Sequence, residues 1–110
     1  GEVWTVNGFF IRSMPTPALP SPNEHRFVVR HARTGPQGEV IVVIDPREVS
    51  RVARVAGRQL PANNTFWRQQ AERALMSHLF RETSLPQGKR LMVDRVSDDA
   101  LLLARDWRKE

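Results

Sequence analysis

The sequence predicts an α+β fold with a mainly antiparallel sheet of four to six strands, in the order ββ-ββ-αα-ββ, and two helices packed on one face of the sheet. Three observations predict it. Runs of β-branched and aromatic residues come in pairs separated by turn residues, as in hairpins. The middle of the chain has apolar residues at helical spacing. A length of 110 residues and a hydrophobic fraction of 40% suit one globular domain, which we expect to span residues 1–110.

The first hairpin is expected to turn at Asn7 and Gly8. These two residues tolerate the positive φ angles of a type I′ turn, and apolar runs flank them on both sides. We therefore expect strands at residues 3–6 and 9–13. Residues 14–22 contain four prolines and are expected to form an extended loop.

The second hairpin is expected from two β-branched runs, at residues 26–32 and 39–44, which are separated by glycine and proline at residues 34–38. Residues 40–44 are apolar at every position. A strand with that pattern is typically buried on both faces, so we expect it to be central in the sheet.

The first helix is expected to begin after Asp45, which is a good N-cap. Pro46 suits the first helical position, and Glu48 completes a capping-box pattern. Apolar residues follow at helical spacing, and Gly57 or Pro61 is expected to end the helix.

The second helix is expected to begin near Asn64 and Thr65 and to end at about Glu82. Its apolar residues again recur at the helical period. The proline and glycine of residues 86–88 prevent any continuation.

The tail of the chain permits two interpretations. The prediction is a third hairpin, with strands at residues 90–96 and 100–107, which completes the order given above. The alternative is a final helix at residues 98–108, which Ser97 or Asp98 would cap and which the leucines favour.

The chain is basic, with a formal net charge of +5 from 15 arginines, 2 lysines and 12 acidic residues. The planar donor fork of arginine suits phosphate and carboxylate groups, so the composition favours a polyanionic partner. A GC-rich genome would also favour arginine, whatever the function.

The composition excludes several kinds of site. The absence of cysteine excludes disulfides, zinc–thiolate sites, iron–sulfur clusters and cysteine nucleophiles. No apolar run approaches the roughly 20 residues that span a bilayer, and no signal peptide is visible. We therefore expect a cytoplasmic protein without a membrane partner.

No catalytic or metal-binding motif is present. The glycines are scattered at turns rather than gathered in a phosphate-binding loop, and neither a nucleophile elbow nor a zinc-protease motif occurs. The three histidines, His25, His31 and His78, lack the spacing of a metal site. We therefore expect no catalytic residue, no metal and no cofactor.

The main candidate site is a line of arginines on the first helix, at Arg47, Arg51, Arg54 and Arg58. These residues fall within roughly 60° of one another around a helix, and Glu48 is expected to point away from them. Like charges at this spacing cost a helix about 0.2–0.5 kcal/mol per pair, so the line suggests a function such as bridging successive phosphates. The alternative is a solvated face whose arginines pair with acids elsewhere in the fold.

A second candidate surface lies on the first sheet strands. If one face of the sheet is open, Phe9 or Phe10 beside Arg12 and Arg30 would form a platform on which nucleobases stack. Trp4 could join either side of the sheet. The alternative is that all these rings belong to the core.

Together these features predict a small, non-catalytic nucleic-acid-binding module with low sequence specificity, in which arginines contact the phosphates of DNA or RNA. The alternative is a protein-interaction or dimerisation domain, or an accessory subunit that binds an acidic partner. An open apolar sheet face without a basic rim would favour this alternative. Pairing of the arginine line with acids of the same fold would also favour it.

Overall fold

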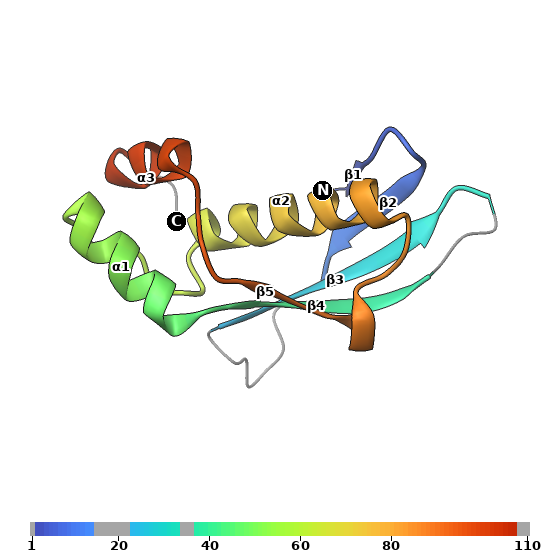
Figure 1. The fold of residues 1–110 in the computed structure, drawn as a ribbon, viewed down its shortest axis with the longest axis horizontal. Helices are drawn as coiled ribbons and strands as arrows, with labels where there is room; N and C mark the ends of the chain where they lie inside the picture. The colour runs from blue at the N-terminus through green and yellow to red at the C-terminus, as the bar shows by residue number, and fades with distance from the viewer. Residues whose placement is uncertain (1, 15–22, 34–36, 108–110) are drawn as a thin grey trace.

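The computed structural model describes residues 2–14, 23–33 and 37–107. These residues have the α+β class that the sequence predicts, with a five-stranded sheet and three α-helices (Figure 1). The elements follow one another as β1 (Glu2–Trp4), β2 (Phe9–Ser13), β3 (Glu24–His31), β4 (Gly38–Ile44), α1 (Pro46–Ala56), α2 (Thr65–Glu82), the 3-10 turn η1 (Gln87–Lys89), β5 (Arg90–Val93) and α3 (Asp98–Arg105).

The strands lie in sequence order, β1-β2-β3-β4-β5, and the sheet is mixed rather than antiparallel throughout. The first four strands pair antiparallel, whereas β5 pairs parallel to β4. The predicted order ββ-ββ-αα-ββ is therefore wrong in its last step, and the observed order is ββ-ββ-αα-βα. The two helices between β4 and β5 form the long crossover that a parallel pair requires.

The predicted third hairpin is wrong because the second half of the tail is helical. The Ser97 hydroxyl accepts a hydrogen bond from the N–H of Ala100 at 3.1 Å and so caps α3, as in the alternative interpretation. Asp98 and Asp99 occupy the first turn of α3, where acidic side chains complement the helix dipole. The preference of leucine for helix acts in the same direction.

The first hairpin forms where expected, but its turn is not type I′. Within the turn only Gly8 has a positive φ, of 97°, and the N–H of Gly8 donates to the carbonyl of Thr5 at 3.0 Å. The Asn7 side chain donates to the carbonyls of Leu79 and Phe80, at 3.1 and 3.5 Å. Asn7 therefore anchors the hairpin to the end of α2.

The first helix begins and ends as predicted, but it has no capping box. The Asp45 carboxylate accepts the N–H of Arg47 at 2.9 Å, and Gly57 ends the helix with a φ of 72°. The carboxylate of Glu48 bonds elsewhere, and the N–H of Asp45 donates to the carbonyl of Val93. This last bond joins the start of α1 to the end of β5.

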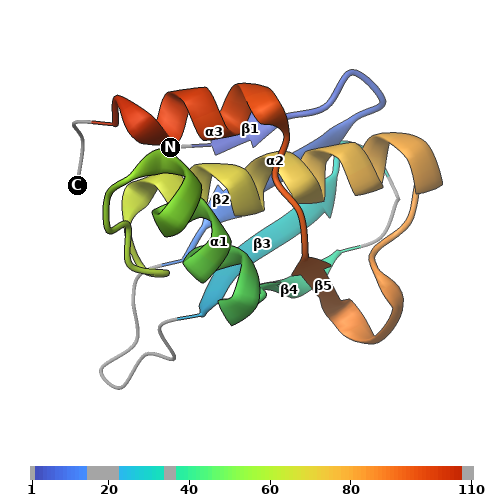
Figure 2. The same ribbon diagram turned by 60° about the vertical axis from the view of Figure 1, so that its left-hand side comes forward.

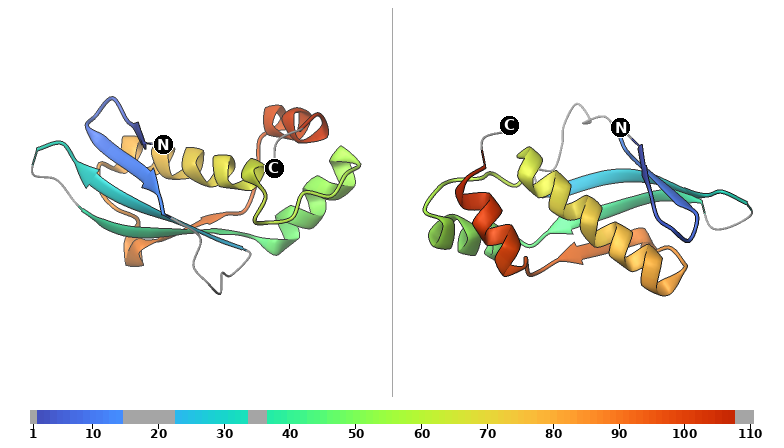
Figure 3. Two further views of the ribbon diagram at one scale, coloured as in Figure 1. Left: turned by 180° about the vertical axis from the view of Figure 1, so that it is seen from behind. Right: turned by 90° about the horizontal axis from the view of Figure 1, so that it is seen from above.

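Only α2 packs across the sheet, on what we call the inner face (Figure 3). The helices α1 and α3 pack against each other beyond the end of β4 (Figure 2). The prediction that both helices pack on one face of the sheet is therefore wrong for α1. The core between α2 and the sheet consists mainly of these fully buried side chains: Phe9, Ile11, Phe27, Val29, Val40, Val42, Ile44, Phe66, Trp67, Ala71, Leu75 and Leu79.

β4 is an interior strand, paired with β3 and with the edge strand β5, whereas the middle of the sheet is β3; β4 is buried on one face only. Val40, Val42 and Ile44 point to the inner face and are fully buried. Ile41 and Val43 point to the opposite, outer face, which none of the α-helices in the described residues covers, and both remain partly exposed. The prediction of burial on both faces is therefore wrong for the isolated chain.

Two predicted loops fall largely outside the described residues, at 15–22 and 34–36. The strands on either side of them pair as hairpins, β2 with β3 and β3 with β4. In the described part of the chain, no helix has both the length and the apolar content that crossing a membrane requires.

Candidate functional site

The arginine line of α1 does not form one free basic surface. Arg47 has a side chain that is 91% exposed, but its guanidinium pairs with the carboxylate of Asp45 at 2.9 Å. Arg54 and Arg58 are exposed, and Arg58 donates to the carbonyl of Arg105 at 3.4 Å. Within the described residues, Arg54 and Arg58 are the members of the line without an acidic partner.

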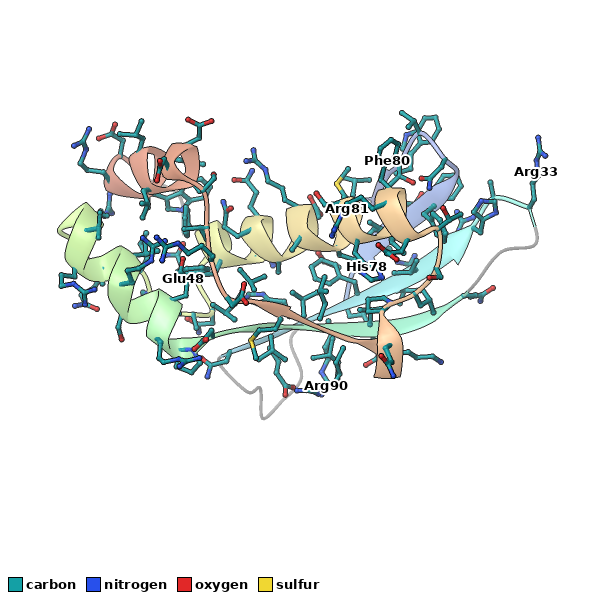
Figure 4. The ribbon with its side chains drawn as sticks, viewed as in Figure 1. Arg33, Glu48, His78, Phe80, Arg81 and Arg90 are labelled. Atoms are coloured by element: carbon teal, nitrogen blue, oxygen red, sulfur yellow. The ribbon has the colours of Figure 1, made fainter. Side chains whose placement is uncertain are left out.

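Arg51 belongs to an internal ion pair. Its guanidinium donates through Nε and Nη2 to the Glu48 carboxylate, both at 2.7 Å, and Glu48 Oε2 also accepts the N–H of Val96 at 2.7 Å. These bonds, that of Arg51 above all, hold the pKa of the Glu48 carboxyl below its ordinary value although the group is buried. The prediction that Glu48 points away from the arginines is wrong. Glu48 faces the segment between β5 and α3 and ties α1 to it (Figure 4).

Phe9 and Phe10 point to opposite faces of the sheet, as neighbours on a strand must. Phe9 is fully buried on the inner face, with its ring 4.9 Å from that of His31, so it cannot contact a ligand at the surface. The prediction that Phe9 belongs to the binding site is therefore wrong. Phe10 lies on the outer face, which it shares with Arg12 and Arg30.

Four residues of the outer face form what we call the platform: Trp4, Phe10, Arg12 and Arg30. The rings of Trp4 and Phe10 are stacked, with centroids 5.9 Å apart and planes at 14°, because the β1–β2 register pairs these two residues. The Arg30 guanidinium lies over the Phe10 ring, 4.3 Å from its centroid, because Arg30 is the partner of Phe10 on β3. Trp4 is 64% exposed.

The platform can bind an aromatic group and an anion side by side. An exposed indole beside a phenyl ring offers a flat surface on which a nucleobase stacks. Guanidinium donors bind phosphate or carboxylate oxygens. Arg30 also pairs with Glu2, at 3.5 Å, whereas Arg12 is exposed and has no ion pair among the described residues. Arg12 is therefore the guanidinium most available to an incoming anion.

The platform and the arginine line lie on different parts of the molecule. In Figure 1, α1 is at one end of the longest axis, and the β1–β2 hairpin lies in the opposite half of the molecule. The molecule measures 45 Å along that axis. The candidate residues of the two surfaces are therefore separate sites and do not form one continuous basic face.

The rest of the outer face is an aliphatic strip, which consists of Val28, Ile41, Val43 and Met92 on three adjacent strands. Met92 is 53% exposed, and the other three are partly exposed. Figure 4 shows Arg90, a charged neighbour of the strip, on the side of the sheet opposite α2. The charged neighbours pair with one another, as Arg26–Glu39 at 2.9 Å, Arg26–Glu24 at 3.5 Å and Arg90–Glu24 at 3.4 Å.

The histidines do not converge on a site. His25 Nε2 lies 2.8 Å from the carbonyl of Ala62, to which it donates, and burial is the main cause that lowers the pKa of His25. His31 Nε2 lies 3.0 Å from the carbonyl of Asn7. His78 is on α2 (Figure 4). Across the residues that the structure describes, no group of three or more potential ligands is placed to hold a metal ion.

Trp4 is the site residue that the sequence interpretation left unassigned. Its face is decided by the length of the hairpin turn, because a turn from Thr5 to Gly8 places Trp4 opposite Phe10. Residues opposite each other in a sheet share a face. The correct turn type would therefore have placed Trp4 on the platform from the sequence.

Comparisons of the chain with models of protein families, with curated proteins and with solved structures found no significant match. The functional argument therefore depends on the geometry of the two surfaces of the outer face.

Proposed function

We propose that the protein binds single-stranded nucleic acid through the platform, without catalysis. The observation that carries the proposal is the exposed stack of Trp4 on Phe10, with Arg30 over the second ring and Arg12 on the same face. A nucleobase would stack on the indole, and the guanidiniums would contact the phosphates on either side of it. The proposal keeps the predicted function and moves it from α1 to the sheet.

A single strand suits this surface better than a duplex. The stacking surface is the exposed Trp4 indole, and a base reaches such a surface only when it is not stacked inside a double helix. Stacking of one base on an aromatic side chain contributes about 1–3 kcal/mol and depends little on the base. The low sequence specificity that the sequence predicts follows from this mode of binding.

Dependence on Trp4 separates the platform from the arginine line, because the same salt slope is expected for both surfaces. Each neutralised phosphate of a single strand contributes about −0.7 to the slope of log K against log salt concentration. Arg12 and Arg30 would give a slope of about −1.4, and so would Arg54 and Arg58, since the other two arginines of the line are paired with acids. Salt-dependent binding that is lost with Trp4 identifies the platform.

The first test is a titration of a fluorescently labelled oligothymidylate with the protein, followed by anisotropy at two salt concentrations. We expect Trp4→Ala to weaken binding roughly tenfold or more, because it removes the stacking surface. The matched control is Phe80→Ala, since Phe80 is an aromatic residue on α2 that is 56% exposed and lies outside the platform. Equal binding by wild type and Trp4→Ala, or no binding to any oligonucleotide, would refute the proposal.

A second candidate function is a protein-interaction module, and the aliphatic strip favours it. Two of the four α1 arginines pair with acids of the same fold, as expected for that alternative. Where the strip crosses β4 and β5 it also lacks a basic rim, because Arg26 and Arg90 are paired with glutamates; Arg12 of the platform lies beside Val28 only. This candidate concerns a different part of the outer face from the platform.

A further inference from the structure

The strand β4 has the sequence of a strand with two covered faces, but the described residues cover only one of them. Its outward residues Ile41 and Val43 are as apolar as the buried residues of its inner face. Half-solvated strands normally alternate apolar and polar residues, and continuous apolar runs mark strands that are buried on both sides. The run therefore indicates that something covers the strip in the functional state.

The charges around the strip limit what this partner is. Around the part of the strip on β4 and β5, Arg26 and Arg90 are balanced by Glu24 and Glu39, so these charges sum to zero; Arg12, beside Val28 at the other end of the strip, belongs to the platform. A polyanion or an anionic membrane surface gains nothing from such a surface, because each guanidinium that would attract it lies beside a carboxylate that repels it. A partner with apolar residues and both signs of charge fits.

The strip carries its charges in rows across the strands. The strand register places Arg26, Ile41 and Arg90 in one row, and the neighbouring row on this face contains Glu24, Val43 and Met92. Arg26 of one row therefore lies beside Glu24 of the other, and each row has an apolar residue of β4.

We propose that the strip docks a second copy of this chain, face to face, around a two-fold axis. An axis that runs between the two rows and parallel to them places Arg26 of each copy opposite Glu24 of the other, and Arg90 opposite Met92. The same axis places Ile41 of each copy opposite Val43 of the other. The surface is then complementary to itself in charge and in apolar character, as a two-fold interface requires. The proposal does not depend on nucleic-acid binding by the platform.

The test uses light scattering after size-exclusion chromatography, over a range of concentrations, with two charge-reversal variants. One variant carries Arg26→Glu, and the other carries Glu24→Arg. In each variant alone the residues at positions 24 and 26 that face each other across the axis have like charge, so we expect monomers, whereas the wild type has twice the mass of the chain. A mixture of the two variants should restore a species of twice that mass.

The mixing step separates loss of the interface from loss of folding, because misfolded chains would not regain a dimer on mixing. Circular dichroism of each variant checks the fold directly. A wild type that remains monomeric at all concentrations would overturn the proposal. This holds also if the strip docks a different protein. A dimer that both variants leave intact would also overturn it. Oligonucleotide binding is measured on the same variants, so failure of the dimer and failure of the proposed function remain distinguishable.

Discussion

Glu48 lies three residues before Arg51 and 48 residues before Val96, and its carboxylate bonds to both. Helical spacing predicted that Glu48 points away from the arginine line, but its carboxylate pairs with Arg51 three residues later, and the packing of α3 against α1 leaves it buried. The sequence pattern around Glu48 is that of a surface residue. In the structure its buried carboxylate accepts the backbone N–H of Val96, which would otherwise lack a hydrogen-bond acceptor. No local signal in the sequence contains that information.

Glu48→Ala should destabilise the protein by about 1–3 kcal/mol, because the buried N–H of Val96 loses its acceptor. Arg51, whose side chain is 19% exposed, can turn towards water. Urea unfolding followed by circular dichroism measures the free energy of unfolding. The control Arg54→Ala, an exposed residue of the same helix, should change it by less than about 0.5 kcal/mol. A Glu48→Ala variant as stable as the control would contradict the assigned role of Glu48.

His25 should make stability depend on pH. Burial lowers its pKa in the folded protein below the ordinary value of 6.5, so the unfolded chain binds a proton more readily than the folded one. The contribution of His25 is fully present above about pH 6.5 and is lost as the pH falls from there towards the folded-state pKa. Unfolding in urea at pH 7.5 and at about pH 5.5 should therefore show a smaller free energy at the lower pH.

The matched variant for this measurement is His25→Gln, whose amide can still donate to the carbonyl of Ala62. The decrease in stability over the same pH range should be smaller in this variant, because the titrating group is gone. An identical decrease in wild type and variant would show that other groups cause the pH dependence.

At the scale of elements, local signals predicted five strands and two helices close to their observed positions. Asp45 and Gly57 bound α1, Asn64 caps α2, and both early hairpins form. Local signals did not decide whether residues 98–107 form a helix or a strand. Their leucines favour a helix, but the same apolar run could also pair as a strand. The parallel pairing of β5 with β4 depends on the crossover of both helices and has no local signature.

Gly8 should be the more sensitive of two glycines that have positive φ angles. An alanine Cβ at Gly8 would lie 2.9 Å from His31 Nε2, whereas at Gly57 nothing lies within 4 Å. Gly57→Ala should cost about 1 kcal/mol for its left-handed backbone, and Gly8→Ala should cost about 1 kcal/mol more. Thermal or urea unfolding of both variants measures the difference, and equal losses would mean that the hairpin adjusts around the new methyl group.

At the scale of the whole molecule, the sequence identified basic residues correctly but could not place them relative to the acids. Two arginines of α1 are neutralised by Asp45 and Glu48, whereas Arg12 and Arg30 lie beside exposed rings. Which rings are exposed depends on strand register, since a shift of one residue exchanges the two faces of a strand. The sequence therefore predicted the platform only on the condition that one face of the sheet is open.

The central claim is that the outer face of the sheet, and not α1, contacts nucleic acid. The most direct test is a titration of isotopically labelled protein with an oligothymidylate, followed by NMR of the three tryptophan indole signals and the backbone amides. We expect the Trp4 indole and the amides of β1, β2 and the end of β3 to shift, while the indoles of the buried Trp67 and Trp107 do not. Shifts concentrated at Arg54 and Arg58 on α1, or no shifts at all, would contradict the account.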